Sequence, residues 1–157
     1  MDGALLTLIV AAPFALATAY SDLKTMEIAS QWGISTAVAF LGLVFATLPM
    51  GDALFRVGAA FAILIVLMLL FFVGGVAGGD AKAMATFALL VAPIDAGFVL
   101  LLLSVNGLVM LAVISLLRRT RLAAGEWKFW SAERRFPYGV ALCATLLIYL
   151  SLVATVV

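Results

Sequence analysis

The sequence contains no histidine and only one cysteine, Cys143. A chain without histidine has no Ser-His or Cys-His nucleophile pair, because each pair needs an imidazole as its base. Zinc sites are built mainly from Cys thiolates and His nitrogens, so we expect no metal and no cofactor. A single cysteine excludes an internal disulfide, and we interpret Cys143 as a small buried hydrophobic residue.

Charged residues are also scarce. They make up 11% of the 157 residues, whereas hydrophobic residues make up 67%. A soluble domain is typically about 45–50% apolar and about 25% charged, so this chain has more apolar surface than a soluble fold could bury. The net charge of +1 gives no indication of a nucleic-acid partner. The composition predicts an all-α, polytopic membrane protein that forms one membrane-embedded domain over residues 1–157 and contacts the lipid bilayer.

A membrane-spanning helix needs about 20 mostly apolar residues. The N-terminal segment lacks the basic residues of a signal peptide, so we expect it to be retained as the first span. The fourth apolar segment is too short for a straight crossing, and Pro93 and Asp95 predict a turn after it. The sequence predicts about six transmembrane helices, at 3–21, 31–49, 55–76, 83–95, 97–117 and 138–157.

The basic residues predict how these helices are oriented. With six spans, Lys24, Lys82 and the bases of segment 118–136 all fall on one side, and Arg56 falls on the other. The positive-inside rule then places the basic loops in the cytoplasm and both termini on the extracytoplasmic side. A five-span alternative with a re-entrant fourth segment would separate the basic loops. Segment 118–136, where bases alternate with aromatic residues, predicts either an amphipathic helix at the headgroups or a contact with a substrate or partner.

Two aspartates stand apart from the other polar residues. Asp22 and Asp80 each follow a predicted odd-numbered span at its cytoplasmic end, and each precedes a lysine by two residues. An ionisable residue at membrane depth is costly and faces a partner or a water-filled cavity, so two carboxylates at equal depth could meet. A close pair shares one proton: the ionised member can accept a proton from water, and the neutral member can polarise a carbonyl. This is the chemistry of aspartic proteases. The alternative is that each aspartate only caps a helix.

Four glycines, Gly74, Gly75, Gly78 and Gly79, precede Asp80. Glycine lets the backbone leave helical geometry and lets another chain approach closely. An open loop of this kind beside an aspartate would help to accommodate an extended peptide. The alternative interpretation is that the glycines serve helix packing.

Three further charged residues lie next to the aspartates in the sequence. Lys24 and Lys82 could anchor the chain to lipid phosphate, or they could tune the neighbouring aspartates or meet an acidic residue of a substrate. Glu27 is either a third carboxylate near the site or a solvated loop residue.

Three segments resemble one protein family. Residues 21–28 resemble the first active-site segment of the type IV prepilin peptidases, and residues 77–82 resemble their second, the Gly-x-Gly-Asp segment of intramembrane aspartyl proteases. Residues 136–141 resemble a segment that opens the last span in the short branch associated with Flp-type, tight-adherence pili. The resemblance covers nearly the whole chain. It implies an all-helical protein of the bacterial inner membrane that cleaves the leader from membrane-inserted prepilins at the cytoplasmic face. Asp22 and Asp80 would be the catalytic pair, with Gly79 the glycine before the second aspartate.

The sequence departs from the family pattern in two places. Ile28 is followed by Ala29-Ser30 where the family usually has Pro-Asn, and Ala77 replaces the first glycine of Gly-x-Gly-Asp. These changes leave room for an altered substrate preference. Longer family members carry an extra N-terminal segment, often with paired cysteines, that is linked to N-methylation, so we expect peptidase activity without methyltransferase activity here.

Two non-peptidase functions remain open at this stage. One is a non-catalytic scaffold or assembly subunit of a pilus or secretion system. The other is a small proton-coupled transporter, although such a transporter would need charged residues near the middle of its spans and the sequence places its charges at the span ends. The sequence gives no indication of the oligomeric state.

Overall fold

The computed structural model describes the backbone of residues 3–25, 30–119 and 137–156. These residues form helices and short turns, with no strand in the described ranges, so the predicted all-α class is confirmed. The elements are α1 (Gly3–Thr25), α2 (Ser30–Thr47), α3 (Met50–Phe72), α4 (Gly78–Ala88), the 3₁₀ turn η1 (Pro93–Asp95), α5 (Ala96–Arg119) and α7 (Tyr138–Val156).

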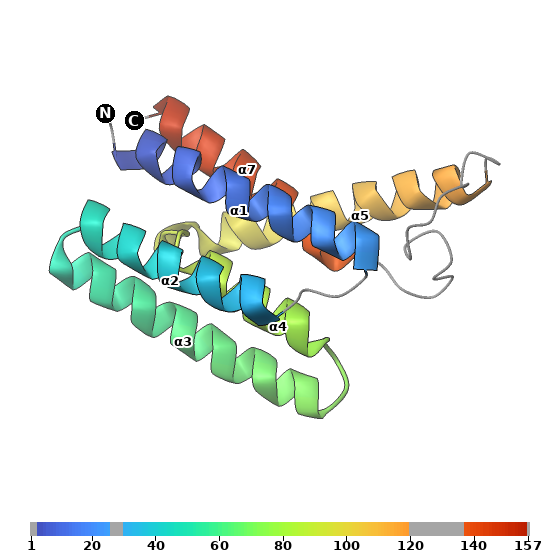
Figure 1. The fold of residues 1–157 in the computed structure, drawn as a ribbon, viewed down its shortest axis with the longest axis horizontal. Helices are drawn as coiled ribbons and strands as arrows, with labels where there is room; N and C mark the ends of the chain where they lie inside the picture. The colour runs from blue at the N-terminus through green and yellow to red at the C-terminus, as the bar shows by residue number, and fades with distance from the viewer. Residues whose placement is uncertain (1–2, 26–29, 120–136, 157) are drawn as a thin grey trace.

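Successive helices run in opposite directions through the bundle (Figure 1). Helices α1, α3 and α5 end, and α2, α4 and α7 begin, at one end of the molecule. We call this the aspartate end, because Asp22 lies near the end of α1 and Asp80 near the start of α4. Both described termini, Gly3 and Val156, lie side by side at the opposite end, which we call the terminal end. The side of the membrane that each end faces remains a prediction.

Four helical segments are long and apolar enough to cross a membrane: Gly3–Thr25, Met50–Phe72, Pro93–Leu117 and Tyr138–Thr155. The other two helices are shorter. The apolar part of α2 is Gly33–Thr47, and α4 has only 11 residues. At about 1.5 Å per residue, α4 covers roughly half of the hydrocarbon thickness. The structure therefore shows four candidate spans, and a crossing by all six helices remains a prediction.

The fourth helix differs from its predicted position of 83–95. It begins earlier, at Gly78, and ends at Ala88, before a turn that leads into η1. Pro93 prevents the helix from continuing to residue 95, since a proline disfavours helical geometry in the residue before it and has no N–H to donate. Ala92 is accordingly extended, with φ −68° and ψ 131°. Because α4 begins at Gly78, Asp80 lies in the first turn of α4. We had expected it to follow directly after the end of the third helix.

The glycines before Asp80 have two different roles. Gly74 has a φ of 79°, in the left-handed region, and its N–H bonds to the Phe71 carbonyl at 2.9 Å. The N–H of Gly75 bonds to the Leu70 carbonyl, so this pair ends α3 as glycine-based helix C-caps do. Gly78 and Gly79, in contrast, are helical residues of α4, so the predicted open loop beside Asp80 is wrong at these two positions.

Small residues bring the core helices close together. Ala11 and Ala15 of α1 are fully buried, and α1 packs along α7 for most of its length (Figure 1). Small side chains allow this close approach in a membrane bundle. Phe40 of α2 fills the space between Phe14 and Phe87, with ring centroids 6.0 Å apart in each pair. This core fixes α1, α4 and α7, the three helices that carry the candidate site.

Candidate active site

Asp22 is the last member of the buried stripe of α1. The inward-facing residues of this helix are Ala11, Ala15, Thr18 and Asp22, at the spacing of three and four residues that keeps side chains on one face. Asp22 is only 5% exposed. The Thr18 hydroxyl donates a hydrogen bond to the Phe14 carbonyl of its own helix at 2.8 Å. Asp22 is therefore the polar group of this stripe that faces the neighbouring helices.

The first turn of α7 lies directly on Asp22. A Cβ added to Gly139 would stand 2.8 Å from Oδ2 of Asp22 and 3.0 Å from its Cγ, closer than real Cβ atoms come. The backbone N–H groups of Gly139 and Val140 are directed at the same carboxyl group. The first N–H groups of a helix have no acceptor within the helix and favour a negative group nearby. A glycine is therefore needed at position 139 for α7 to begin against the carboxyl group.

One oxygen of Asp22 is available for chemistry. Oδ2 is buried and has no hydrogen-bond partner within the described part of the chain. A buried polar atom without a partner is costly, and such atoms are rare away from functional sites. The atom can therefore accept a hydrogen bond from a group that enters the site.

Asp80 approaches the same place from α4. It is half-buried in the first turn of that helix, and its charge acts on Asp22 and on the Tyr138 side chain. Asp80 lies outside the four candidate spans, and burial raises the pKa of its carboxyl group above the ordinary value. The fold thus places two carboxyl groups, from α1 and α4, within electrostatic range of each other near the start of α7.

The two predicted lysines lie on the exposed sides of their helices. Lys24 is exposed, and its Nζ stands 5.6 Å from the centroid of the Tyr20 ring, within the range of a cation–π contact. Lys82 is exposed and lines an outer groove of α2, α3 and α4. Residues two apart in a helix point about 200° from each other, so Lys82 lies on the opposite side of α4 from Asp80. Glu27 and most of the basic segment, at 120–136, lie outside the described residues.

Two neighbours of the pair were not predicted as site residues from physical reasoning alone. Gly139 and Tyr138 belong to the Pro-Tyr-Gly segment that opens α7, and only the family resemblance pointed to it. Cys143 is 2% exposed, as predicted for a buried hydrophobic residue, and lies one turn beyond Gly139. Its thiol is close enough to Asp22 to be affected by that charge. The i, i+4 spacing of Gly139 and Cys143 is the sequence signal that both face α1.

Comparison with known proteins gives one result at the level of the family. The model of the type IV leader peptidase family matches residues 9–156. The matched region includes Asp22, Asp80 and the start of α7. Neither the curated proteins nor the solved structures gave a match.

Proposed function

The chain belongs to the type IV leader peptidase family, and we propose that it is an aspartic endopeptidase whose catalytic pair is Asp22 and Asp80. The family is one of peptidases with prepilin substrates and a membrane setting. The observation that supports the residue assignment is that these two carboxyl groups, which come from different helices, lie at one end of the bundle within electrostatic range of each other. Two carboxyl groups are sufficient for peptide hydrolysis without histidine, serine or metal.

The proposed reaction divides the work between the two carboxyl groups. One carboxylate accepts a proton from water while the water oxygen attacks the scissile carbonyl carbon. The other, protonated, carboxyl group donates a hydrogen bond to the carbonyl oxygen and assists its development of negative charge. When the tetrahedral intermediate collapses, the C–N bond breaks and a proton passes from the pair to the leaving amine. The pair therefore holds one proton at the start and at the end of the cycle.

The position of the pair supports a cut at the junction between a leader and a hydrophobic helix. Asp22 lies in the last turns of α1, which is long and apolar enough to cross a membrane. The site is therefore at the boundary of the apolar layer, where a membrane-inserted substrate leaves its hydrophobic helix. We propose that the substrate is a Flp-type prepilin, that the aspartate end faces the cytoplasm, and that the enzyme acts in the bacterial inner membrane without methylating the new N-terminus.

The remaining predicted residues have smaller roles in this proposal. Gly78 and Gly79 keep the first turn of α4 free of side chains next to Asp80. Gly78 has little spare room, since an added Cβ would lie 3.3 Å from the Phe71 ring. Lys24 and Lys82, both exposed, attract the acidic groups of the bilayer or of the substrate around the site, and Glu27 is proposed as an outlying carboxylate.

The test is cleavage of a co-expressed Flp-type prepilin, read as a mobility shift of the pilin. We expect the wild-type enzyme to cleave, and Asp22→Asn and Asp80→Asn to accumulate in the membrane without cleaving. Asparagine is nearly isosteric with aspartate, so the substitutions remove the titratable group at almost constant shape. Cleavage by either variant near the wild-type rate would contradict the proposed pair.

A non-catalytic relative is the second candidate, favoured by one observation. Ala77 replaces a family glycine and forms the N-cap of α4, where it offers no side-chain hydrogen bond. A scaffold would leave the prepilin uncleaved in the wild type as well as in both Asp→Asn variants, which the same experiment measures. A transporter has less support, because no Asp, Glu, Lys or Arg lies at the middle of the four candidate spans in the described ranges.

A further inference from the structure

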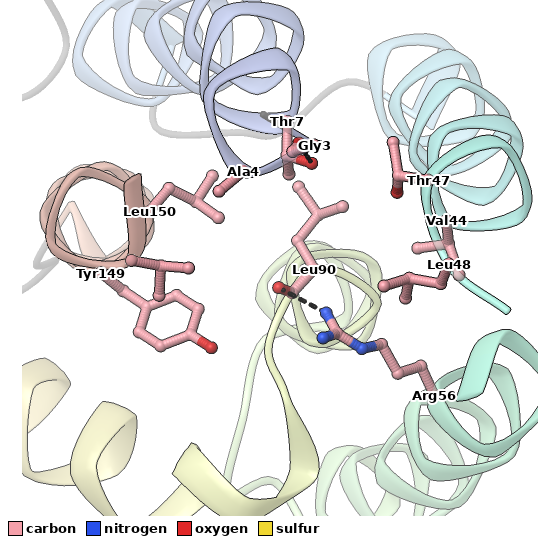
Figure 2. Close-up of a pocket in the computed structure, with 11 residues that line it drawn as sticks. Gly3, Ala4, Thr7, Val44, Thr47, Leu48, Arg56, Leu90, Tyr149 and Leu150 are labelled. Atoms are coloured by element: carbon pink, nitrogen blue, oxygen red, sulfur yellow. Dashed lines mark hydrogen bonds between the residues drawn. The ribbon is translucent and has the colours of Figure 1, made fainter. Parts of the chain in front are cut away.

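A second polar site lies at the terminal end of the bundle, opposite the aspartate pair. It is a cavity of about 180 Å³ between α1, α2, α3, α7 and the turn after α4 (Figure 2). A water molecule occupies about 30 Å³ of liquid, so the cavity has room for a group as large as a phosphate. The central polar group is the guanidinium of Arg56, which reaches in from the first turns of α3 (Figure 2).

Arg56 is half-buried and only partly satisfied. Its Nη1 donates a hydrogen bond to the Leu90 carbonyl at 3.0 Å, which fixes the direction of the side chain. Within the described ranges no carboxylate forms an ion pair with it. A guanidinium carries five N–H donors in a planar fork that matches the oxygens of a phosphate. A partly buried cation of this kind is costly to leave without a counter-ion.

The other polar groups of the cavity already have partners. The Thr7 and Thr47 hydroxyls each donate at 2.8 Å to a carbonyl one turn earlier in their own helices. The Tyr149 hydroxyl donates to Oδ2 of Asp95 at 2.8 Å and accepts from the Ala92 N–H at 3.1 Å. The remaining N–H groups of the guanidinium are therefore the main donors that the cavity offers to a ligand.

The location of the cavity indicates where that ligand comes from. The candidate spans Gly3–Thr25 and Met50–Phe72 begin at this end, and Tyr138–Thr155 ends here. The cavity therefore lies at the edge of the apolar layer, where lipid phosphates are found. A lipid phosphate at this depth can therefore reach the guanidinium of Arg56 from the surrounding bilayer.

We propose that this cavity binds the headgroup of a phospholipid, with its phosphate on Arg56. Such a lipid would hold together α3, the turn after α4, and α7 at the end of the protein away from the peptidase site. The proposal does not depend on the proposed function, since it uses no residue of the aspartate pair.

The test is native mass spectrometry of the full-length, delipidated protein titrated with short-chain phosphatidylethanolamine. We expect one lipid to bind to the wild type, and Arg56→Gln to weaken its binding about tenfold or more, because a charge-assisted contact is lost. Arg56→Lys should retain part of the affinity, since it keeps the charge but not the planar fork. Equal binding by wild type and Arg56→Gln would overturn the proposal.

Two controls separate this site from general attraction of lipid phosphate. Ser104→Ala changes an exposed polar side chain of α5 that donates only to the Leu100 carbonyl of its own helix, and it should change the affinity by less than about twofold; a loss equal to that of Arg56→Gln would overturn a specific site. Inorganic phosphate at millimolar concentration should not displace the lipid. Displacement of the lipid by phosphate would show that a free anion is the ligand and would also overturn the proposal.

Discussion

At the scale of single residues, the closest contact of the aspartate site is between Gly139 of α7 and Asp22 of α1. Gly139 lies so close to the Asp22 carboxyl group that no side chain fits between them. Asp22 itself was singled out from the sequence, because it is an ionisable residue at the end of an apolar span, two residues before a lysine, as Asp80 is. Its contact with Gly139 was not predictable from spacing, because the two residues are far apart in the sequence and only tertiary packing joins them.

The substitution Gly139→Ala should therefore damage the site directly. The added Cβ must displace either the Asp22 carboxyl group or the first turn of α7, and overpacking of this kind typically costs about 1–3 kcal/mol. We expect prepilin cleavage to fall by about tenfold or more, measured by initial rates with membranes that contain equal amounts of enzyme.

The matched control is Gly107→Ala in α5. An added Cβ at Gly107 has no atom within 4 Å, and alanine is favoured over glycine in a helix by roughly 0.5–1 kcal/mol. This variant should cleave at the wild-type rate and unfold no more easily than the wild type. An unchanged rate in Gly139→Ala would show that Asp22 does not need the position observed here.

The Asp80 carboxyl group should make stability depend on pH. Burial raises its pKa in the folded state, so the folded protein holds this proton more tightly than the unfolded chain does. The free energy of unfolding then decreases as the pH rises from the unfolded pKa, about 4, through the raised folded pKa. Asp80→Asn removes this titration. We expect the variant to match or exceed the thermal stability of the wild type at neutral pH, and to lose that advantage near pH 4. A difference between the two proteins that does not change with pH would contradict the raised pKa.

At the scale of elements, the position of α4 decides whether the two aspartates meet. Its first turn carries Asp80, and the turn that follows its last residue is linked to α3 through Arg56 and to α7 through Tyr149. Five of the 11 residues of α4 are buried, and these polar links beyond its far end add to the packing that fixes its place in the bundle.

The sequence predicted a short fourth helix but misplaced its limits. Glycine has low helix propensity, so Gly78 and Gly79 indicated a loop, yet both residues are helical in the packed bundle. Gly74, which has the positive φ, does provide the turn that the glycines indicated. The glycine pattern in the sequence does not show which glycine bends the chain, because the bend depends on how the neighbouring helices pack.

Tyr149→Phe tests the link between α7 and the turn after α4. The substitution removes both hydrogen bonds of a side chain that is 4% exposed and leaves the Ala92 N–H without its acceptor. We expect a loss of about 1–3 kcal/mol in the free energy of unfolding, measured by thermal or denaturant unfolding in detergent.

Ser151→Ala provides the comparison for that experiment. Ser151 is two residues further along α7, is exposed, and donates only to the Leu147 carbonyl of its own helix. Its replacement should change the stability by less than about 0.5 kcal/mol. Equal effects of the two substitutions would show that the Tyr149 bonds do not hold the turn in place.

For the whole molecule, composition alone was enough to predict the class of the fold. Large exposed side chains such as Phe61, Leu69 and Leu108 cover the outside of the bundle, as lipid-facing residues do. The alternating direction of the helices agrees with the predicted placement of both termini together (Figure 1). The cavity at Arg56 was not predicted, because it arises from five elements that no local pattern connects.

The central claim is that Asp22 and Asp80 act as one catalytic unit. The most direct measurement is kcat for cleavage of a purified Flp-type prepilin by the wild type, Asp22→Asn, Asp80→Asn and the double variant. We predict that each single substitution lowers kcat by roughly 10²–10⁴-fold and that the double variant is no slower than the slower single variant, because either loss already disables the pair. A single variant near the wild-type rate, or losses that multiply in the double variant, would contradict the account.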